Sequence, residues 1–192
     1  MPVFQLALPG YSTSSPLASG SVSFDIYVEQ LTNGRGSLEI DLGTLGAANV
    51  ASRGSSLAAF QINTSTATVP GSLSYFNNTT SGGSITTSPY VMSLNAVNNI
   101  SVAWDASTKV YTISVNGVQV VSSAYTVASI AGFSSIRFTK VSDGGTTDLN
   151  YFIDNVAVSA IPEPGTVGLA FLALAFCGVV MRKQWAKSSQ LS

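Results

Sequence analysis

The sequence predicts an all-β protein, an antiparallel β-sandwich followed by one C-terminal transmembrane helix. Two observations in residues 1–160 predict the sandwich: short segments in which apolar and polar residues alternate, and clusters of Gly, Asn and Ser between those segments. A third observation predicts the helix, because residues 165–181 form an uncharged apolar run. No convincing helical pattern precedes residue 165.

The stretch Asn98–Ser122 carries the clearest strand pattern. Apolar residues occupy every second position in two segments, Ile100–Trp104 and Tyr111–Val115, as in strands with one buried face. Asn116-Gly117 then predicts a type I′ hairpin turn, because both central positions of that turn need a positive φ. Since Val118–Val121 returns after the turn, the stretch predicts a three-stranded meander.

Other segments repeat this alternation and predict further strands. In Ser37–Leu42 every second residue is apolar, and Glu39 and Asp41 lie on the opposite face. The remaining predicted strands are Ser21–Gln30, Leu57–Asn63, Ser72–Phe76, Ser135–Val141 and Leu149–Ser159.

The meander resembles the concanavalin A-like, laminin-G-like jelly-roll family. In that family one strand ends in Trp-Asp and the next in Asn-Gly or Asp-Gly, as Trp104-Asp105 and Asn116-Gly117 do here. The last strand of the family often has an apolar residue before Asp-Asn-Val, which matches Ile153–Val156. The resemblance covers roughly Ser21–Ser159 and implies that the sandwich is a jelly roll.

The composition excludes several classes of function. The chain has no histidine, so it cannot form a Ser-His-Asp triad or a histidine-based metal site. Its one cysteine, Cys177, lies in the apolar run, which leaves residues 1–160 without a disulfide or a thiolate nucleophile. Only 9% of residues are charged and no dense basic patch is present, so we expect no nucleic-acid binding.

The apolar run 165–181 is long enough to span a membrane. As a helix it would measure roughly 25 Å, which suits a hydrocarbon core of about 30 Å. All 9 acidic residues precede residue 165, whereas the basic residues Arg182 and Lys183 directly follow the run. This asymmetry predicts that the tail after residue 181 is the cytoplasmic end of the anchor.

The motif Pro162-Glu163-Pro164, the apolar run and the basic end together resemble the PEP-CTERM sorting signal. The resemblance implies that an exosortase cuts near the motif after the segment has held an exported protein in the inner membrane. It also implies that the product reaches the cell surface or an exopolysaccharide matrix, as in a biofilm. We therefore divide the chain into a β-sandwich domain (1–160), a sorting motif (161–164), a transmembrane helix (165–181) and a basic cytoplasmic tail (182–192).

The N-terminal sequence departs from this family. Residues 1–16 have no Lys or Arg and no long apolar core, so they do not read as a signal peptide. We expect the true start of the protein to lie upstream.

Glu39 and Asp41 are the sharpest candidates for catalysis. Laminarinase-type glucanases of the same superfold carry Glu-Ile-Asp on one strand, closely followed by a second Glu. Alternate strand residues share a face, so such carboxylates line one cleft. Here the next position on that face is Gly43, so the acid/base carboxylate is missing and we expect no enzyme.

Two kinds of binding site are also candidates. A structural Ca²⁺ would need carboxylates, and no ligand set is assigned among Asp25, Asp143, Asp148 and Asp154. Carbohydrate binding would use aromatic and amide side chains in polar, loop-like contexts, while Trp104 shares a face with apolar residues and is expected in the core. These carbohydrate candidates are Tyr75, Phe76, Asn77 and Tyr90.

The sequence therefore predicts an exported surface or matrix protein with a non-catalytic role in adhesion, carbohydrate binding or structural assembly. Two alternatives stay open. One is a glycan-active enzyme that uses Glu39 and Asp41 with a third acid from a distant loop. The other is a membrane-anchored domain that keeps residues 165–192.

Overall fold

A computed structural model of the chain describes the residues 3–8, 10–12, 14–30, 36–43, 56–64, 69–76, 85–125, 131–142 and 149–160. The chain divides into two compact units, Met1–Ala160 and Ile161–Ser192, and all described residues belong to the first. The predicted sorting motif, transmembrane helix and basic tail therefore lie outside the described residues. Among the residues described, no helix is long and apolar enough to cross a membrane.

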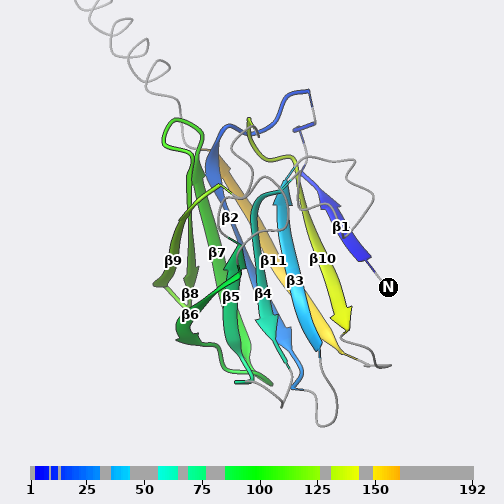
Figure 1. Ribbon diagram of the computed structural model, residues 1–192. Coiled ribbons are helices and arrows are strands. Elements are labelled where there is room, and N and C mark those ends of the chain that lie inside the picture. Colours follow the sequence, from blue (N-terminus) through cyan, green and yellow to red (C-terminus); the bar gives the residue numbers. More distant parts are fainter. Residues whose placement is uncertain are drawn as a thin grey trace, which may run out of the picture. The chain divides into compact units, whose positions relative to one another are not determined.

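The described strands form two antiparallel sheets that face each other (Figure 1). The six-stranded sheet has the order β1-β10-β3-β4-β5-β6. Its strands are β1 (Val3–Ala7), β3 (Gly36–Gly43), β4 (Ser56–Asn63), β5 (Ser72–Phe76), β6 (Ile85–Val91) and β10 (Ser135–Ser142). The five-stranded sheet has the order β11-β2-β7-β8-β9. Its strands are β2 (Ser19–Val28), β7 (Val97–Asp105), β8 (Val110–Val115), β9 (Val118–Ala124) and β11 (Tyr151–Ala160).

This arrangement confirms the predicted all-β antiparallel sandwich, and each strand predicted from alternation is present. Two strands were not predicted. The first, β1, lies at the start of the chain, and the second, β6, contains Pro89 and a mostly polar sequence. Both are edge strands, where a strand has only one partner and its apolar pattern is correspondingly weak.

The core lies between the sheets and is filled by alternate residues of the central strands. Phe24 of β2 meets Phe138 of β10 edge to face, with ring centroids 5.4 Å apart. Trp104 is buried, as its shared face with Ile100 and Val102 predicted, and its indole N–H donates to the Leu17 carbonyl at 3.0 Å. The buried ring of Trp104 thus has its one polar group satisfied.

The predicted hairpin turn at Asn116-Gly117 is present, with φ values of 51° and 80°. The Asn116 side chain reaches across to β7, where its Oδ1 accepts the Asn99 backbone N–H at 2.9 Å. Its Nδ2 donates to the Asn98 Oδ1 at 3.1 Å. Both ends of the amide are therefore tied to the neighbouring strand, which fixes the register of the hairpin.

Two glycines with almost the same backbone conformation allow a test of the packing. Gly71 and Gly117 have φ of 81° and 80°, but a Cβ on Gly71 would collide with the Met92 carbonyl oxygen, whereas one on Gly117 would meet nothing within 4 Å. We expect Gly117→Ala to lower the free energy of unfolding by about 1–2 kcal/mol, the cost of a left-handed alanine. Gly71→Ala should cost at least about 1 kcal/mol more, because a backbone oxygen cannot move aside easily.

The measurement is urea unfolding of the full chain in mild detergent, followed through the fluorescence of the buried Trp104. Equal losses in the two variants would show that the close approach of Gly71 to Met92 is not a packing constraint.

Candidate functional site

A row of polar side chains crosses the outer face of the six-stranded sheet, the face turned away from the core. The strand registers place Thr139 opposite Glu39, Glu39 opposite Gln61, Gln61 opposite Ser74, and Ser74 opposite Thr87. These five residues, here called the polar row, come from β10, β3, β4, β5 and β6. Exposure rises along the row, from buried Thr139 and Glu39 through half-buried Gln61 and Ser74 to exposed Thr87.

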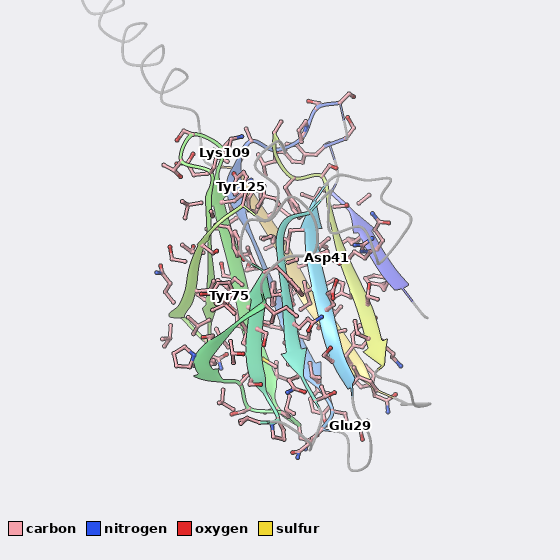
Figure 2. All side chains as sticks on the ribbon, in the orientation of Figure 1. Glu29, Asp41, Tyr75, Lys109 and Tyr125 are labelled. Atoms are coloured by element: carbon pink, nitrogen blue, oxygen red, sulfur yellow. The ribbon has the colours of Figure 1, made fainter. Side chains whose placement is uncertain are left out.

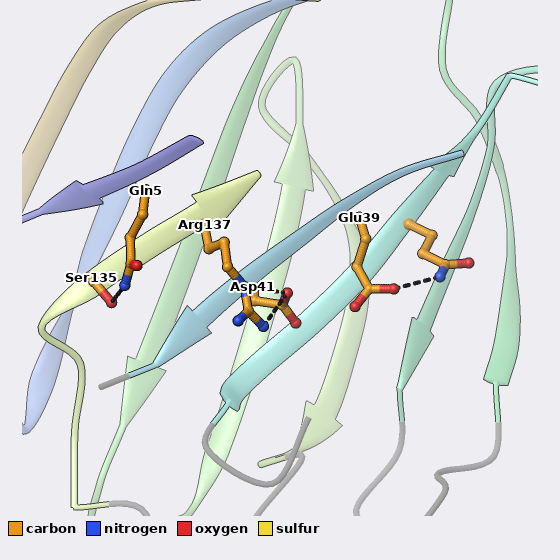
Figure 3. Close-up of polar contacts among 6 residues, drawn as sticks. Gln5, Glu39, Asp41, Ser135 and Arg137 are labelled. Carbon is orange, nitrogen blue, oxygen red and sulfur yellow. Dashed lines mark hydrogen bonds and ion pairs between the residues drawn. The ribbon is translucent and has the colours of Figure 1, made fainter. Parts of the chain in front are cut away.

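The inner part of the polar row is held by a short charge-assisted hydrogen bond. The Gln61 Nε2 donates to the Glu39 Oε2 at 2.7 Å, and Glu39 is only 1% exposed (Figure 3). Thr139 is fully buried, and its hydroxyl has no hydrogen-bond partner within the described part of the chain. The buried Glu39 carboxylate thus fixes one side of the half-buried Gln61 amide, and the other side of the amide reaches the surface.

A second row runs beside the first and contains a buried ion pair. The registers align Gln5 of β1 with Arg137, Arg137 with Asp41, and Asp41 with Ala59. The Arg137 Nε and Nη2 donate to the Asp41 Oδ2 at 3.2 and 2.9 Å (Figure 3). Arg137 and Asp41 are buried, with 5% and 3% exposure, so each needs the other to offset the loss of hydration.

The two acids of β3 lie on the outer face of the sheet but are shielded from solvent. Glu39 and Asp41 do share the face opposite the core, as their spacing predicted, but both are buried. Among the described residues, no three carboxylate, histidine or cysteine side chains gather in one place. The third acid required by the glucanase-like alternative is therefore not found in this part of the chain, and Asp41 engages a guanidinium instead.

The predicted carbohydrate-binding aromatics lie in strands, although their polar sequence context resembled that of loops. Tyr75 lies opposite Phe60, on the core side of β5, and Tyr90 is part of β6; both are half-buried against the core cluster. Phe76 is fully buried. Since two rings are half-buried and the third is fully buried, none of the three is an open platform. Asn77 lies outside the described residues.

Two of the four aspartates considered for calcium, Asp143 and Asp148, lie outside the described residues. Asp25 and Asp154 face each other on β2 and β11. The Asn155 and Asn99 side chains donate to Asp25 at 2.7 and 2.9 Å, and these hydrogen bonds lower the pKa of its carboxyl. The carboxylate oxygens of Asp25 are thus already engaged by amides, and no ligand set for a metal emerges from the described residues.

Several residues of the two rows were not singled out from the sequence. Arg137 carries a recognisable signal, because a charge within an apolar, alternating strand must lie on the outer face or be paired. Gln61, Ser74 and Thr87 carry none, since small polar residues are common throughout this chain. Only the strand registers bring them into one row.

No protein-family model and no curated protein matches the sequence. Solved structures do match its fold. A sialidase structure aligns with a TM-score of 0.57 and 16% identity over 82% of this chain, a match that spans only 14% of the sialidase chain. A tetrameric galectin from the sponge Cinachyrella sp. aligns with a TM-score of 0.55 and 13% identity, covering 82% of this chain and 99% of the galectin.

A Pseudomonas aeruginosa alginate lyase aligns with a TM-score of 0.55 and 11% identity, covering 79% of this chain and 68% of the lyase. At such low identities the likeness establishes the fold, which is a jelly-roll β-sandwich as the sequence predicted.

The buried ion pair gives a prediction for stability. Arg137→Met would leave the Asp41 carboxylate buried without its guanidinium, and we expect the free energy of unfolding to fall by about 3–5 kcal/mol. The double variant Asp41→Leu/Arg137→Met removes both charges and should recover most of that loss.

Lys140→Met is the matched control, because Lys140 lies on the same strand but is half-buried. It should change stability by less than about 0.5 kcal/mol. Urea unfolding measures all three. A double variant no more stable than Arg137→Met would mean that the pair is not the reason for the loss.

Proposed function

We propose that the sandwich is a non-catalytic glycan-binding domain and that its polar row binds the sugar. The strongest support is the increase in side-chain exposure along the row, from the Gln61 amide that Glu39 holds to the exposed hydroxyl of Thr87. The fold adds support, because carbohydrate-binding galectins are among the proteins that share it.

The chemistry of the row suits a polyhydroxyl ligand. An amide presents a donor and an acceptor in one plane, and hydroxyls of Ser74 and Thr87 can donate or accept. The Ser74 and Thr87 hydroxyl oxygens lie 3.4 Å apart, next to Gln61 on the neighbouring strand. Because Glu39 already holds the Gln61 amide, binding would cost little ordering of that side chain.

Catalysis has weaker support than binding. A sialidase and an alginate lyase share the fold, so a glycan-active enzyme is the second candidate. A retaining mechanism needs two carboxyl groups about 5 Å apart with an acid and a nucleophile role. In the described part of the chain Asp41 accepts hydrogen bonds from Arg137, and Glu39 accepts one from Gln61. These contacts suit a structural role, in which the carboxylates fix the side chains of the outer face.

We further propose that the domain is exported and sorted through its C-terminus. The support is in the sequence alone: Pro162-Glu163-Pro164, the apolar run 165–181 and the basic end at Arg182 and Lys183. In this proposal the run anchors the protein in the inner membrane until an exosortase-type enzyme cuts near the motif. The sandwich then acts at the cell surface or in an extracellular polysaccharide matrix.

The binding proposal predicts the effect of single substitutions in the row. Gln61→Ala and Thr87→Ala should each weaken binding to a polysaccharide about 2- to 10-fold, the worth of one neutral hydrogen bond. Ser122→Ala, on the outer side of the other sheet, is the matched control and should leave this affinity unchanged.

Affinity electrophoresis in gels that contain galactan, soluble cellulose derivative or alginate measures the change. The full chain is kept in a detergent without a sugar headgroup, so that the detergent does not compete. Retardation by a polymer with equal affinity in all three variants would place binding elsewhere, and no retardation by any polymer would contradict glycan binding.

The sorting proposal predicts the mass of the mature protein. When the gene is expressed with its upstream region in a host that has an exosortase, the surface product should end near Pro162–Pro164. Intact-mass spectrometry gives the C-terminus directly, and Glu163→Ala should leave a product that retains residues 165–192. A wild-type surface product that keeps Met181 and Lys187 would show that the tail is a permanent anchor.

A further inference from the structure

The outer face of the five-stranded sheet carries an exposed apolar row at one end. The registers place Phe152 of β11 opposite Tyr27 of β2, and Tyr27 opposite Val97 of β7. Phe152 and Val97 are each 68% exposed, and the rings of Phe152 and Tyr27 lie 6.0 Å apart at a 55° tilt. We call Phe152, Tyr27 and Val97 the aromatic row. The row is therefore a small apolar surface in contact with solvent.

Carboxylate and amide pairs flank the aromatic row on both sides. On one side the Asn150 Nδ2 donates to the Glu29 Oε2 at 2.6 Å. On the other side the Asn99 and Asn155 amides donate to the two oxygens of Asp25. These planar groups are therefore held in fixed positions beside the rings, at the end of the sandwich where Figure 2 shows Glu29.

Beyond Asp25 the same face becomes flat and lined by hydroxyl groups. The register aligns Ser23, Ser101 and Ser114 on three adjacent strands, and the next outward positions align Ser21 with Ala103 and Thr112. All these side chains are short and uncharged. This part of the face therefore offers hydroxyl groups to a ligand that extends from the row along the sheet.

We propose that the aromatic row and its flanking carboxylate–amide pairs form a second carbohydrate-binding surface, on the sheet opposite the polar row. The apolar C–H face of a sugar ring would pack on Phe152 and Tyr27. Its hydroxyls would bond to the ordered amides and carboxylates on either side. A single chain could then bridge two polysaccharide strands, one on each face of the sandwich, and this bridging rests on the proposed function of the polar row.

The charges on this face favour a neutral glycan as the occupant. Asp25, Asp154 and Glu29 surround the row, while the described basic residues lie elsewhere: Arg137 and Lys140 on β10, and Lys109 at the opposite end, over the Tyr125 ring (Figure 2). Nucleic acid, anionic lipid and uronate-rich polymers would be repelled. A second copy of the chain would bring like carboxylates together, and three side chains fall far short of the roughly 800 Å² per partner of a stable interface.

The test separates binding from bridging. The full chain, in detergent without a sugar headgroup, is mixed with soluble galactan and soluble cellulose derivative, and turbidity reports cross-linking while affinity electrophoresis reports binding. We expect Phe152→Ala to abolish turbidity and to weaken binding about 3- to 10-fold, with binding through the polar row retained. Tyr27→Ala should act in the same way.

Val118→Ala is the matched control, because Val118 is 57% exposed on β9 at the far edge of the same sheet, and it should behave as the wild type. Gln61→Ala should also reduce turbidity, and the double variant Gln61→Ala/Phe152→Ala should give no turbidity and bind more weakly than either single variant. Cooperative urea unfolding verifies that the variants are folded, and the midpoint of the two variants that carry Gln61→Ala is expected below that of the wild type, because buried Glu39 loses its amide donor.

The outcomes distinguish the two proposals. If the wild type binds and Phe152→Ala and Tyr27→Ala match it in both assays, the second surface is refuted while the polar row stands. If the wild type binds neither polymer, the proposed function itself fails. Sedimentation showing a wild-type dimer that Phe152→Ala dissociates would identify the row as a self-interface. Preferential binding in the alginate-containing gels described above, lost in Phe152→Ala, would overturn the charge argument.

Discussion

The pairing register of β3 with β10 and β4 determines both the core and the polar face of the six-stranded sheet. Leu38, Ile40 and Leu42 are fully buried between the sheets, while Glu39 and Asp41 lie between them on the outer face. A slip of one residue would move both carboxylates into the core and three apolar side chains outward. The ion pair with Arg137 and the hydrogen bond from Gln61 exist only in the observed register, so they help to specify it.

The two outer faces share one core and differ in how they are stabilised. On the six-stranded sheet, buried Asp41 is paired with Arg137 and buried Glu39 with Gln61, so removing one partner affects folding as well as the surface. On the five-stranded sheet, Phe152 and Val97 are exposed. Substitutions there should be independent of the other face, because the dense core between the sheets separates the two sets of contacts.

Much of the fold could be predicted because alternation records which residues of a strand face the core. The pattern in β2, β3, β7 and β8 and the Asn116-Gly117 turn indicated the sandwich directly. The edge strands β1 and β6 were not predicted, because a strand with little buried surface shows only weak alternation of apolar and polar residues. The sites were harder to predict: Tyr75, Phe76 and Tyr90 appeared exposed from their polar neighbours, yet Tyr75 and Tyr90 are half-buried against the core and Phe76 is fully buried. The rows combine residues from three to five strands, and only the registers align them.

The locked side chain of Asn116 bears on the chemical durability of the protein. An Asn-Gly pair degrades when the glycine nitrogen attacks the asparagine side-chain carbonyl carbon, which expels ammonia and leaves a succinimide that water opens to aspartate or isoaspartate. Here both ends of the Asn116 amide are bonded to β7, so the carbonyl carbon is held toward that strand and away from Gly117. The hairpin tip is thereby shielded from deamidation for as long as the sheet stays closed, and its ageing should follow the rate of local opening.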